Sequence, residues 1–206
     1  MPKIVDHDLR REQVLDALWR VVRRDGLEGA TIRAIAREAG CSSGVLAHYF
    51  RDKDDILRSA LELSNRRIEQ RVVSVLRRRV GLAALRGVLC ESLPLDADRS
   101  RALHLEVSMW GRAISEERQR REHRRWFDAW RALIVKLLRA AVDAGELPAD
   151  LDVDRASLGL VAFVDGLAVD ALMHPDRVSR ASQRRLIEAQ LAALPVFAGS
   201  VEGALV

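Results

Sequence analysis

The sequence predicts an all-α protein of about nine helices. Only five prolines and twelve glycines interrupt its 206 residues. Between these breaks, apolar residues recur at intervals of three and four positions, and no segment sustains the alternation of a half-buried strand. With 49% hydrophobic and 31% charged residues, the chain has enough apolar side chains to build a core, which argues against disorder.

The first helix is predicted over residues 9–24, where five apolar residues form one stripe: Val14, Ala17, Leu18, Val21 and Val22. The arginines of this segment lie largely outside the stripe. Gly26 and Gly29 then break the pattern, and Thr31 stands where the N-cap of a second helix belongs. That second helix is predicted over residues 32–39.

A third short helix is predicted to follow almost at once, over residues 43–50. Gly40 suits the left-handed residue that ends a helix, and Ser42 is placed to cap the next one. On a helical wheel, Leu46 and Phe50 share a face that the second helix can cover. The small and polar residues lie elsewhere on the wheel: Ser43, Gly44, Val45, Ala47 and His48.

The rest of the chain reads as one long amphipathic helix followed by five more helical segments. The long helix is expected over about residues 53–79, and the others over 82–93, 99–114, 116–144, 155–173 and 179–194. Proline and glycine mark most of the breaks between them. We expect two domains: residues 1–52, built from three helices, and residues 53–206.

Two short helices joined by a tight glycine-containing turn form the helix-turn-helix unit, whose second helix enters the major groove of DNA. Small side chains on the outer face of that helix allow its backbone to approach the bases. Tyr49 and Lys53 at its flank, and Thr31 with Arg33 at the start of the preceding helix, are placed to reach phosphates. The predicted DNA-binding residues are Thr31, Arg33, Ser42, Ser43, Gly44, Val45, His48, Tyr49 and Lys53.

Three of these residues also have a plainer interpretation. Thr31 and Ser42 would cap helices in any helical protein, and an isolated His48 would be a solvated surface histidine. The arginine-rich stretches further along, such as residues 118–125, interleave with glutamates and are expected to be solvated faces.

Three short motifs resemble the signature of TetR-type repressors: Thr31-Ile-Arg33, the segment Ala39-Gly-Cys-Ser-Ser-Gly-Val-Leu46, and His48-Tyr-Phe-Arg-Asp-Lys53. The resemblance covers about the first 57 residues, and Ala47 departs from the aromatic residue often found there. The last motif and the opening Met1-Pro-Lys3 are similar to the choline-responsive, BetI-like subgroup. The resemblance implies a homodimeric repressor that reads a near-palindromic operator and binds a small inducer in its C-terminal helices.

A homodimer must hold its two recognition helices about 34–36 Å apart to meet successive major grooves. The last two long helices carry more apolar residues than one core needs, and small residues among them allow close approach. By the resemblance, the segment 163–166 lies in the helix that family members use for pairing. The predicted interface residues are Leu158, Val161, Ala162, Leu186, Leu191 and Leu194.

Three of the four tryptophans, Trp110, Trp126 and Trp130, lie on two consecutive predicted helices. Together with Glu106, one turn before Trp110, they predict a pocket that holds a quaternary ammonium by ring faces and a carboxylate. The alternative is that these tryptophans are ordinary core or interface residues.

Other function classes find less support in the sequence. Cys41 and Cys90 have no zinc-ligand or disulfide spacing, and the zinc, phosphate-loop and serine-hydrolase motifs are absent, so we expect no cofactor and no enzyme. A net charge of +4 is too small for an architectural DNA binder. With no apolar run of about 18 residues and no signal-peptide core, we expect a cytoplasmic protein without a membrane partner. The alternatives that stay open are a helical-bundle enzyme and a small-molecule-binding protein without sequence-specific DNA binding.

Overall fold

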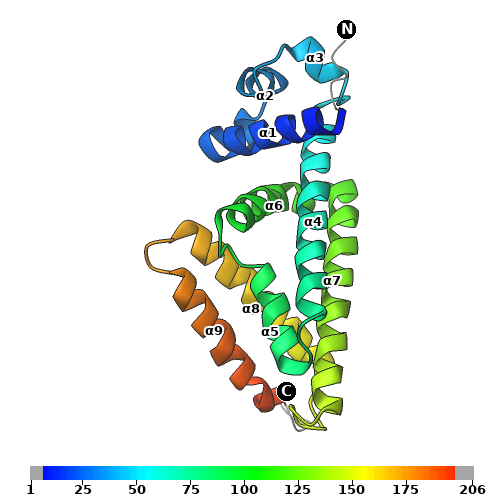
Figure 1. Cartoon of the computed structure of the whole chain (residues 1–206), viewed down its shortest axis with the longest axis vertical. Helices are drawn as coiled ribbons and strands as arrows, with labels where there is room; N and C mark the ends of the chain where they lie inside the picture. The colour runs from blue at the N-terminus through cyan, green and yellow to red at the C-terminus, as the bar shows by residue number, and fades with distance from the viewer. Residues whose placement is uncertain (1–6, 198–206) are drawn as a thin grey trace. The chain divides into compact units, whose positions relative to one another are not determined.

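The computed structural model describes residues 7–197, which form nine α-helices and one 3-10 helix and contain no strand. The all-α prediction is therefore confirmed (Figure 1). The helices are α1 (His7–Gly29), α2 (Ile32–Glu38), α3 (Ser43–Ala47), α4 (Lys53–Leu76), α5 (Gly81–Glu91), α6 (Ala97–Ser115), α7 (Glu117–Asp143), α8 (Val153–Met173) and α9 (Arg180–Ala192). The 3-10 helix η1 (Leu194–Phe197) was not expected.

The chain divides into two compact units. The first contains residues 1–67 and 104–111, and the second contains residues 68–103 and 112–206. Helices α4 and α6 each contribute residues to both units. A functional boundary at residue 52 stays a prediction.

The core of the first unit forms where α1, α2, α3 and the start of α4 present their apolar faces. Leu18, Ile35, Leu46 and Ile56 are at most 1% exposed, and Phe50 is 3% exposed. Leu46 and Phe50 thus share a buried face, as the helical wheel predicts. Helix α1 is longer than expected, but a non-helical residue at Gly26 (φ 72°) interrupts it where the sequence predicts a break.

Helix α3 ends at Ala47, three residues before its predicted end. The amide of His48 donates to the carbonyl oxygens of Leu46 and Val45, so the last turn tightens and the regular helix stops. Phe50 keeps its inward position because its amide still bonds to the Leu46 carbonyl oxygen at 3.0 Å. The prediction of the buried face was correct even though the length was not.

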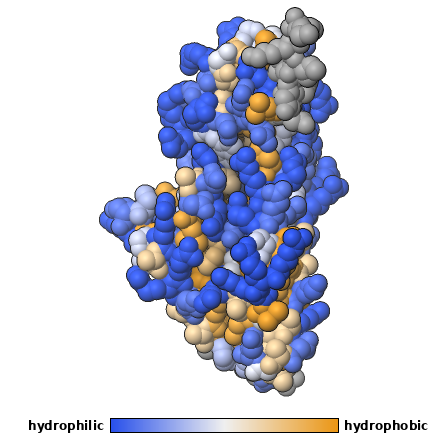
Figure 2. Space-filling model, viewed as in Figure 1, coloured by the Kyte–Doolittle hydropathy of each residue, from blue (hydrophilic) through white to orange (hydrophobic). Residues whose placement is uncertain are grey.

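In the second unit, α5 packs against α7 and α9, and α8 packs against α7 and α9. Figure 1 shows α9 running beside α5 and α8. Large side chains fill this core: Leu85, Leu89, Ile134, Leu138 and Leu160 are each at most 1% exposed. Polar and charged residues cover most of the face seen in Figure 2, and apolar residues gather in smaller patches.

Among the described residues, α8 alone is long and apolar enough to span a membrane by length and composition. Its inner face is buried in the second unit at Ala156, Leu160, Val164 and Ala168. The core helix of a folded protein passes the same test as a membrane span, and 44% of the apolar window of α8 is buried inside the protein.

Candidate nucleic-acid interface

The two short helices of the first unit begin at the caps that the sequence predicts. The Thr31 hydroxyl accepts a hydrogen bond from the Ala34 amide, and the Ser42 hydroxyl accepts one from the Val45 amide, both at 3.2 Å. Gly40 between the helices has φ 66°, a conformation that side chains other than glycine's rarely adopt. These three residues fix where α3 begins.

The outer face of α3 is exposed and made of small or short side chains. We call this face, formed by Ser43, Gly44, Val45, Ala47 and His48, the α3 face. Val45 is 37% exposed, in contrast to its buried neighbour Leu46. A methyl group placed on Gly44 would meet only the Ser42 hydroxyl oxygen, at 3.7 Å, so nothing in the protein crowds the helix there. The α3 face therefore offers backbone and short side chains to a partner.

Arg11 on α1 ties the end of α3 to its neighbours, a role that the sequence did not reveal. One guanidinium nitrogen donates to the Tyr49 carbonyl oxygen at 2.8 Å, and the other donates to the Ser59 hydroxyl of α4 at 3.0 Å. The guanidinium also lies 4.5 Å from the centre of the Phe50 ring, within cation–π range. Arg11 therefore links α1, the residues after α3, and α4.

Two ion pairs hold α2 to α1. Glu38 receives Arg20 at 2.6 Å on one carboxylate oxygen and Arg24 at 3.0 Å on the other. The hydrogen bond from Arg20, followed by that from Arg24, lowers the pKa of Glu38 below its usual value. Helix α2, which braces α3, is thus fastened at its C-terminal end.

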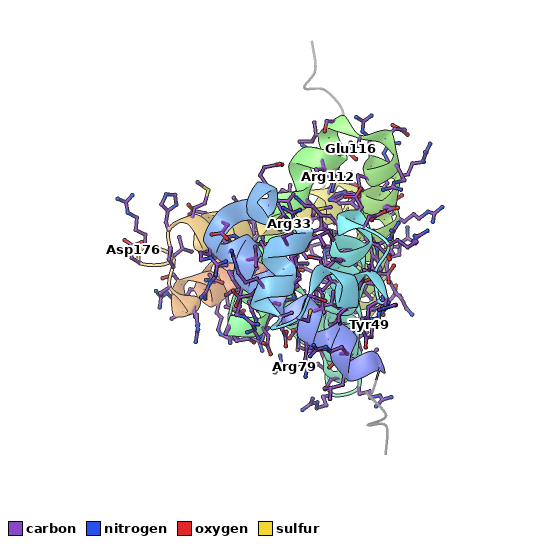
Figure 3. All side chains as sticks on the ribbon, turned by 90° about the horizontal axis from the view of Figure 1, so that it is seen from above. Arg33, Tyr49, Arg79, Arg112, Glu116 and Asp176 are labelled. Carbon is purple, nitrogen blue, oxygen red and sulfur yellow. The ribbon has the colours of Figure 1, made fainter. Side chains whose placement is uncertain are left out.

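The structure brings all nine predicted DNA-binding residues together in the first unit. Seven of them are exposed, whereas Tyr49 and Lys53 are partly buried. Figure 3 labels Arg33 on α2 and Tyr49 just after α3. Lys53 donates its ammonium group to the Leu27 carbonyl oxygen at 2.7 Å, so it already stabilises the end of α1. DNA contact by each of these residues stays a prediction.

The predicted inducer-binding residues are divided between the two units. Glu106 and Trp110 lie one turn apart on α6 in the first unit, and Trp126 and Trp130 lie on α7 in the second. Trp126 is 46% exposed. An inducer site at these residues stays a prediction.

The predicted pairing residues separate into exposed and buried groups. Leu158 is 54% exposed, Leu186 is 42% exposed, and Ala162 is also exposed. Three other residues, Val161, Leu191 and Leu194, are at most 7% exposed and belong to the core of the second unit, which corrects their assignment to a pairing surface. Periodicity identified them as apolar but did not reveal which side of each helix faces the core.

Both cysteines of the chain are free and partly buried. Within the described residues, no group of three or more histidine, cysteine, aspartate or glutamate side chains is placed to hold a metal ion.

Comparison with known proteins points to gene regulation along most of the chain. A family model described as bacterial regulatory proteins of the tetR family matches residues 14–60. A second, described as the C-terminal part of BetI-type transcriptional repressors, matches residues 81–196. The first match contains α2, α3 and their caps, and the second contains α5 to α9.

Individual relatives and solved structures similar to this chain are also transcriptional regulators. The chain is 32% identical to the HTH-type transcriptional regulator PksA of Bacillus subtilis, over 91% of this chain and 90% of that protein. It is 27% identical to the regulator BetI of Paraburkholderia phymatum, over 90% and 93% of the two chains. A transcriptional regulator from Rhodococcus superimposes with a TM-score of 0.75 at 28% identity, covering 93% of this chain and 98% of that one. A putative regulator from Saccharomonospora viridis, solved with choline, shares the fold with a TM-score of 0.82 at 23% identity, covering 90% and 96%.

Proposed function

Because the chain belongs to the TetR family of bacterial regulatory proteins, with a C-terminal domain of the BetI type, we propose that it is a homodimeric repressor released from its operator by a small molecule. Its relatives are transcriptional regulators and not enzymes. The observation that carries the proposal is the exposed α3 face, held in place by two side-chain caps and by Arg11.

The chemistry of the α3 face supports reading of base edges in the major groove. Gly44 and Ala47 let the helix backbone come close to the bases, and His48 and Ser43 supply hydrogen-bonding groups at its surface. Arg33, exposed near the start of α2, supplies a charge for a phosphate. Base contacts would give sequence preference, and the phosphate contacts would fix the register of the protein on DNA.

Pairing of two chains would supply the second recognition helix. The exposed residues Leu158 and Ala162 on α8 and Leu186 on α9 support an apolar pairing surface in the second unit. Such a dimer would present its two α3 helices to half-sites about 34–36 Å apart. We expect the operator to be a near-palindrome with that spacing, and the protein to act in the cytoplasm, where the DNA is.

Release by a ligand requires that the ligand prefer one conformation of the dimer. Helix α4 contributes to both compact units, so a change in the second unit that favours another setting of α4 would reach the DNA-binding residues. A coupling of about 1–3 kcal/mol would weaken operator binding roughly 5- to 150-fold. Intrinsic tryptophan fluorescence would report a ligand near Trp126 or Trp130, and choline-like cations are the first compounds to try at the tryptophan residues.

The test is a footprint of the purified protein on DNA upstream of its own gene and neighbouring genes. The expected result is protection of a near-palindromic site at nanomolar protein, with two half-sites one helical turn apart. Binding of equal strength to unrelated duplexes of the same length would contradict the proposal. A protein that binds small molecules but protects no site would instead be the alternative, a binding protein without sequence-specific DNA recognition.

A further inference from the structure

The second unit contains a pocket with a marked excess of positive charge, which we call the arginine pocket. It lies between the segment that follows α4, helix α5, the start of α6, and α9, and has a volume of about 440 Å³. Five arginines and two glutamates line it, a surplus of three positive charges. A pocket of this size is within the range that holds small organic ligands.

The two glutamates of the arginine pocket are already neutralised. One carboxylate oxygen of Glu91 forms an ion pair with Arg71 Nε at 2.7 Å, and the other forms one with Arg99 Nη1 at 3.2 Å. Glu188 receives Arg86 at 2.7 Å. Both glutamates of the lining are therefore already paired. The remaining arginines of the pocket have no carboxylate of the lining as a counterion.

The uncompensated arginines come from two different elements. Within the described part of the chain, neither Arg79, in the segment after α4, nor Arg184 on α9 has a carboxylate within 4.0 Å, and Arg78 bonds only to Ser74. Figure 3 labels Arg79. A methyl group on Gly87 would lie 3.3 Å from a guanidinium nitrogen of Arg79, so this guanidinium rests directly against the backbone of α5.

Cys90 shows that the positive charges act on a common point. Burial, and to a smaller extent the charge of Glu91, raise the pKa of the Cys90 thiol, while the charges of Arg184, Arg99 and Arg86 act in the opposite direction. The positive charges of arginines on α9, α6 and α5 therefore all act on the Cys90 side chain, which lines the pocket.

We propose that the arginine pocket binds a small organic anion with at least two negatively charged oxygens, from carboxylate or phosphate groups. Planar guanidinium groups match such oxygens in pairs, and Arg79 and Arg184 line the pocket from two different segments and are available to do so. The same surplus of charge disfavours a cation such as choline in this pocket. Anion binding stands independently of DNA recognition, whereas control of the operator by the anion rests on the proposed function.

The experiment is isothermal titration calorimetry of the full chain with inorganic pyrophosphate and with citrate, at constant ionic strength and without DNA. The double variant Arg79→Gln with Arg184→Gln removes the two available guanidinium groups. The matched control is Arg77→Gln with Arg185→Gln, which changes the same net charge at the neighbouring exposed positions, outside the pocket lining. Thermal melts check that both variants fold.

The wild type is expected to bind at least one of the two anions with one site per chain, and the control to keep that affinity within about twofold. The pocket variant should bind at least about tenfold more weakly, a difference of about 1.4 kcal/mol. Preference for pyrophosphate or for citrate would distinguish a phosphate from a carboxylate ligand. No binding of either anion, or an equal loss in both double variants, would overturn the proposal. Because DNA is absent, a failed operator footprint would not affect this result.

Discussion

Among single side chains, we expect sequence-specific recognition to depend most directly on His48. It is exposed on the α3 face, and removal of its imidazole leaves the buried Leu46 and Phe50 in place. We expect His48→Ala to weaken operator binding by about 1–3 kcal/mol and to leave the melting temperature unchanged. Fluorescence anisotropy with labelled operator measures the first quantity, and thermal denaturation measures the second.

The matched control for this change is His104→Ala, which removes an exposed histidine from α6, outside the α3 face. It should bind operator as the wild type does. If His48→Ala binds with wild-type affinity, His48 contacts neither bases nor phosphates and must be removed from the interface.

Asp165 lies in the middle of α8, where burial disfavours the charged form of its carboxylate. Burial raises its pKa to about 6 from 3.8. The folded protein therefore holds a proton that the unfolded chain releases between these values, and the free energy of unfolding should fall as pH rises from about 4 to about 6. The loss should be about 1–2 kcal/mol, less than full burial would give, because the side chain keeps some contact with water.

Asp165→Asn should remove this loss, so the variant is expected to gain stability over the wild type as pH rises from 4 to 7. Urea denaturation of both proteins at several pH values measures the difference. Asp150→Asn, a change at an exposed aspartate, serves as the control. A stability difference that stays constant with pH would show that Asp165 titrates at an ordinary value.

At the scale of elements, the position of α3 depends on Arg11 more than on the length of α3 itself. A helix of five residues has little stability of its own and takes its place from its contacts. Arg11→Ala removes both of the hydrogen bonds that reach the Tyr49 carbonyl and Ser59, together with the contact with Phe50. We expect a loss of about 1–3 kcal/mol in unfolding free energy.

DNA affinity should also fall in Arg11→Ala, and for all sequences together, because the whole α3 face becomes less ordered. Arg10→Ala is the control, since within residues 7–197 the Arg10 side chain bonds only to the nearby Gln13 on the same helix. Chemical denaturation and anisotropy measure the two effects. Loss of affinity for one base position alone would indicate that Arg11 contacts DNA directly.

The short helices α2 and α3 were predictable from local chemistry, whereas the long-range contacts that hold them in place were not. Thr31, Gly40 and Ser42 act within a few residues of themselves, so the sequence reveals both caps and the turn. Arg11 contacts residues 38 and 48 positions away, and no local pattern distinguishes it from the arginine beside it. For the same reason, Leu191 and Leu194 read as surface residues, although contacts made by distant helices bury them.

At the scale of the whole molecule, each chain contributes one recognition helix, α3, in our proposal, so we expect specificity for a palindromic operator to depend on pairing. Two copies on one DNA site bind with the affinity of both halves only if a surface holds them together. The exposed apolar residues on α8 and α9 supply that surface in our proposal, whereas Val161, one turn after Leu158 on α8, is buried in the core of its own chain.

Leu158 is the position at which a substitution is expected to separate pairing from folding. Leu158 is 54% exposed in the single chain, so a charge there costs little in the monomer but much in a buried apolar interface. Leu158→Glu is expected to give a folded monomer in analytical ultracentrifugation and to bind operator at least about a hundredfold more weakly, since the second half-site is lost. Ile114→Glu, at a residue 74% exposed on α6, should remain a dimer and bind normally. If Leu158→Glu stays dimeric, the chains pair through another surface, and the half-site spacing must be derived from that one.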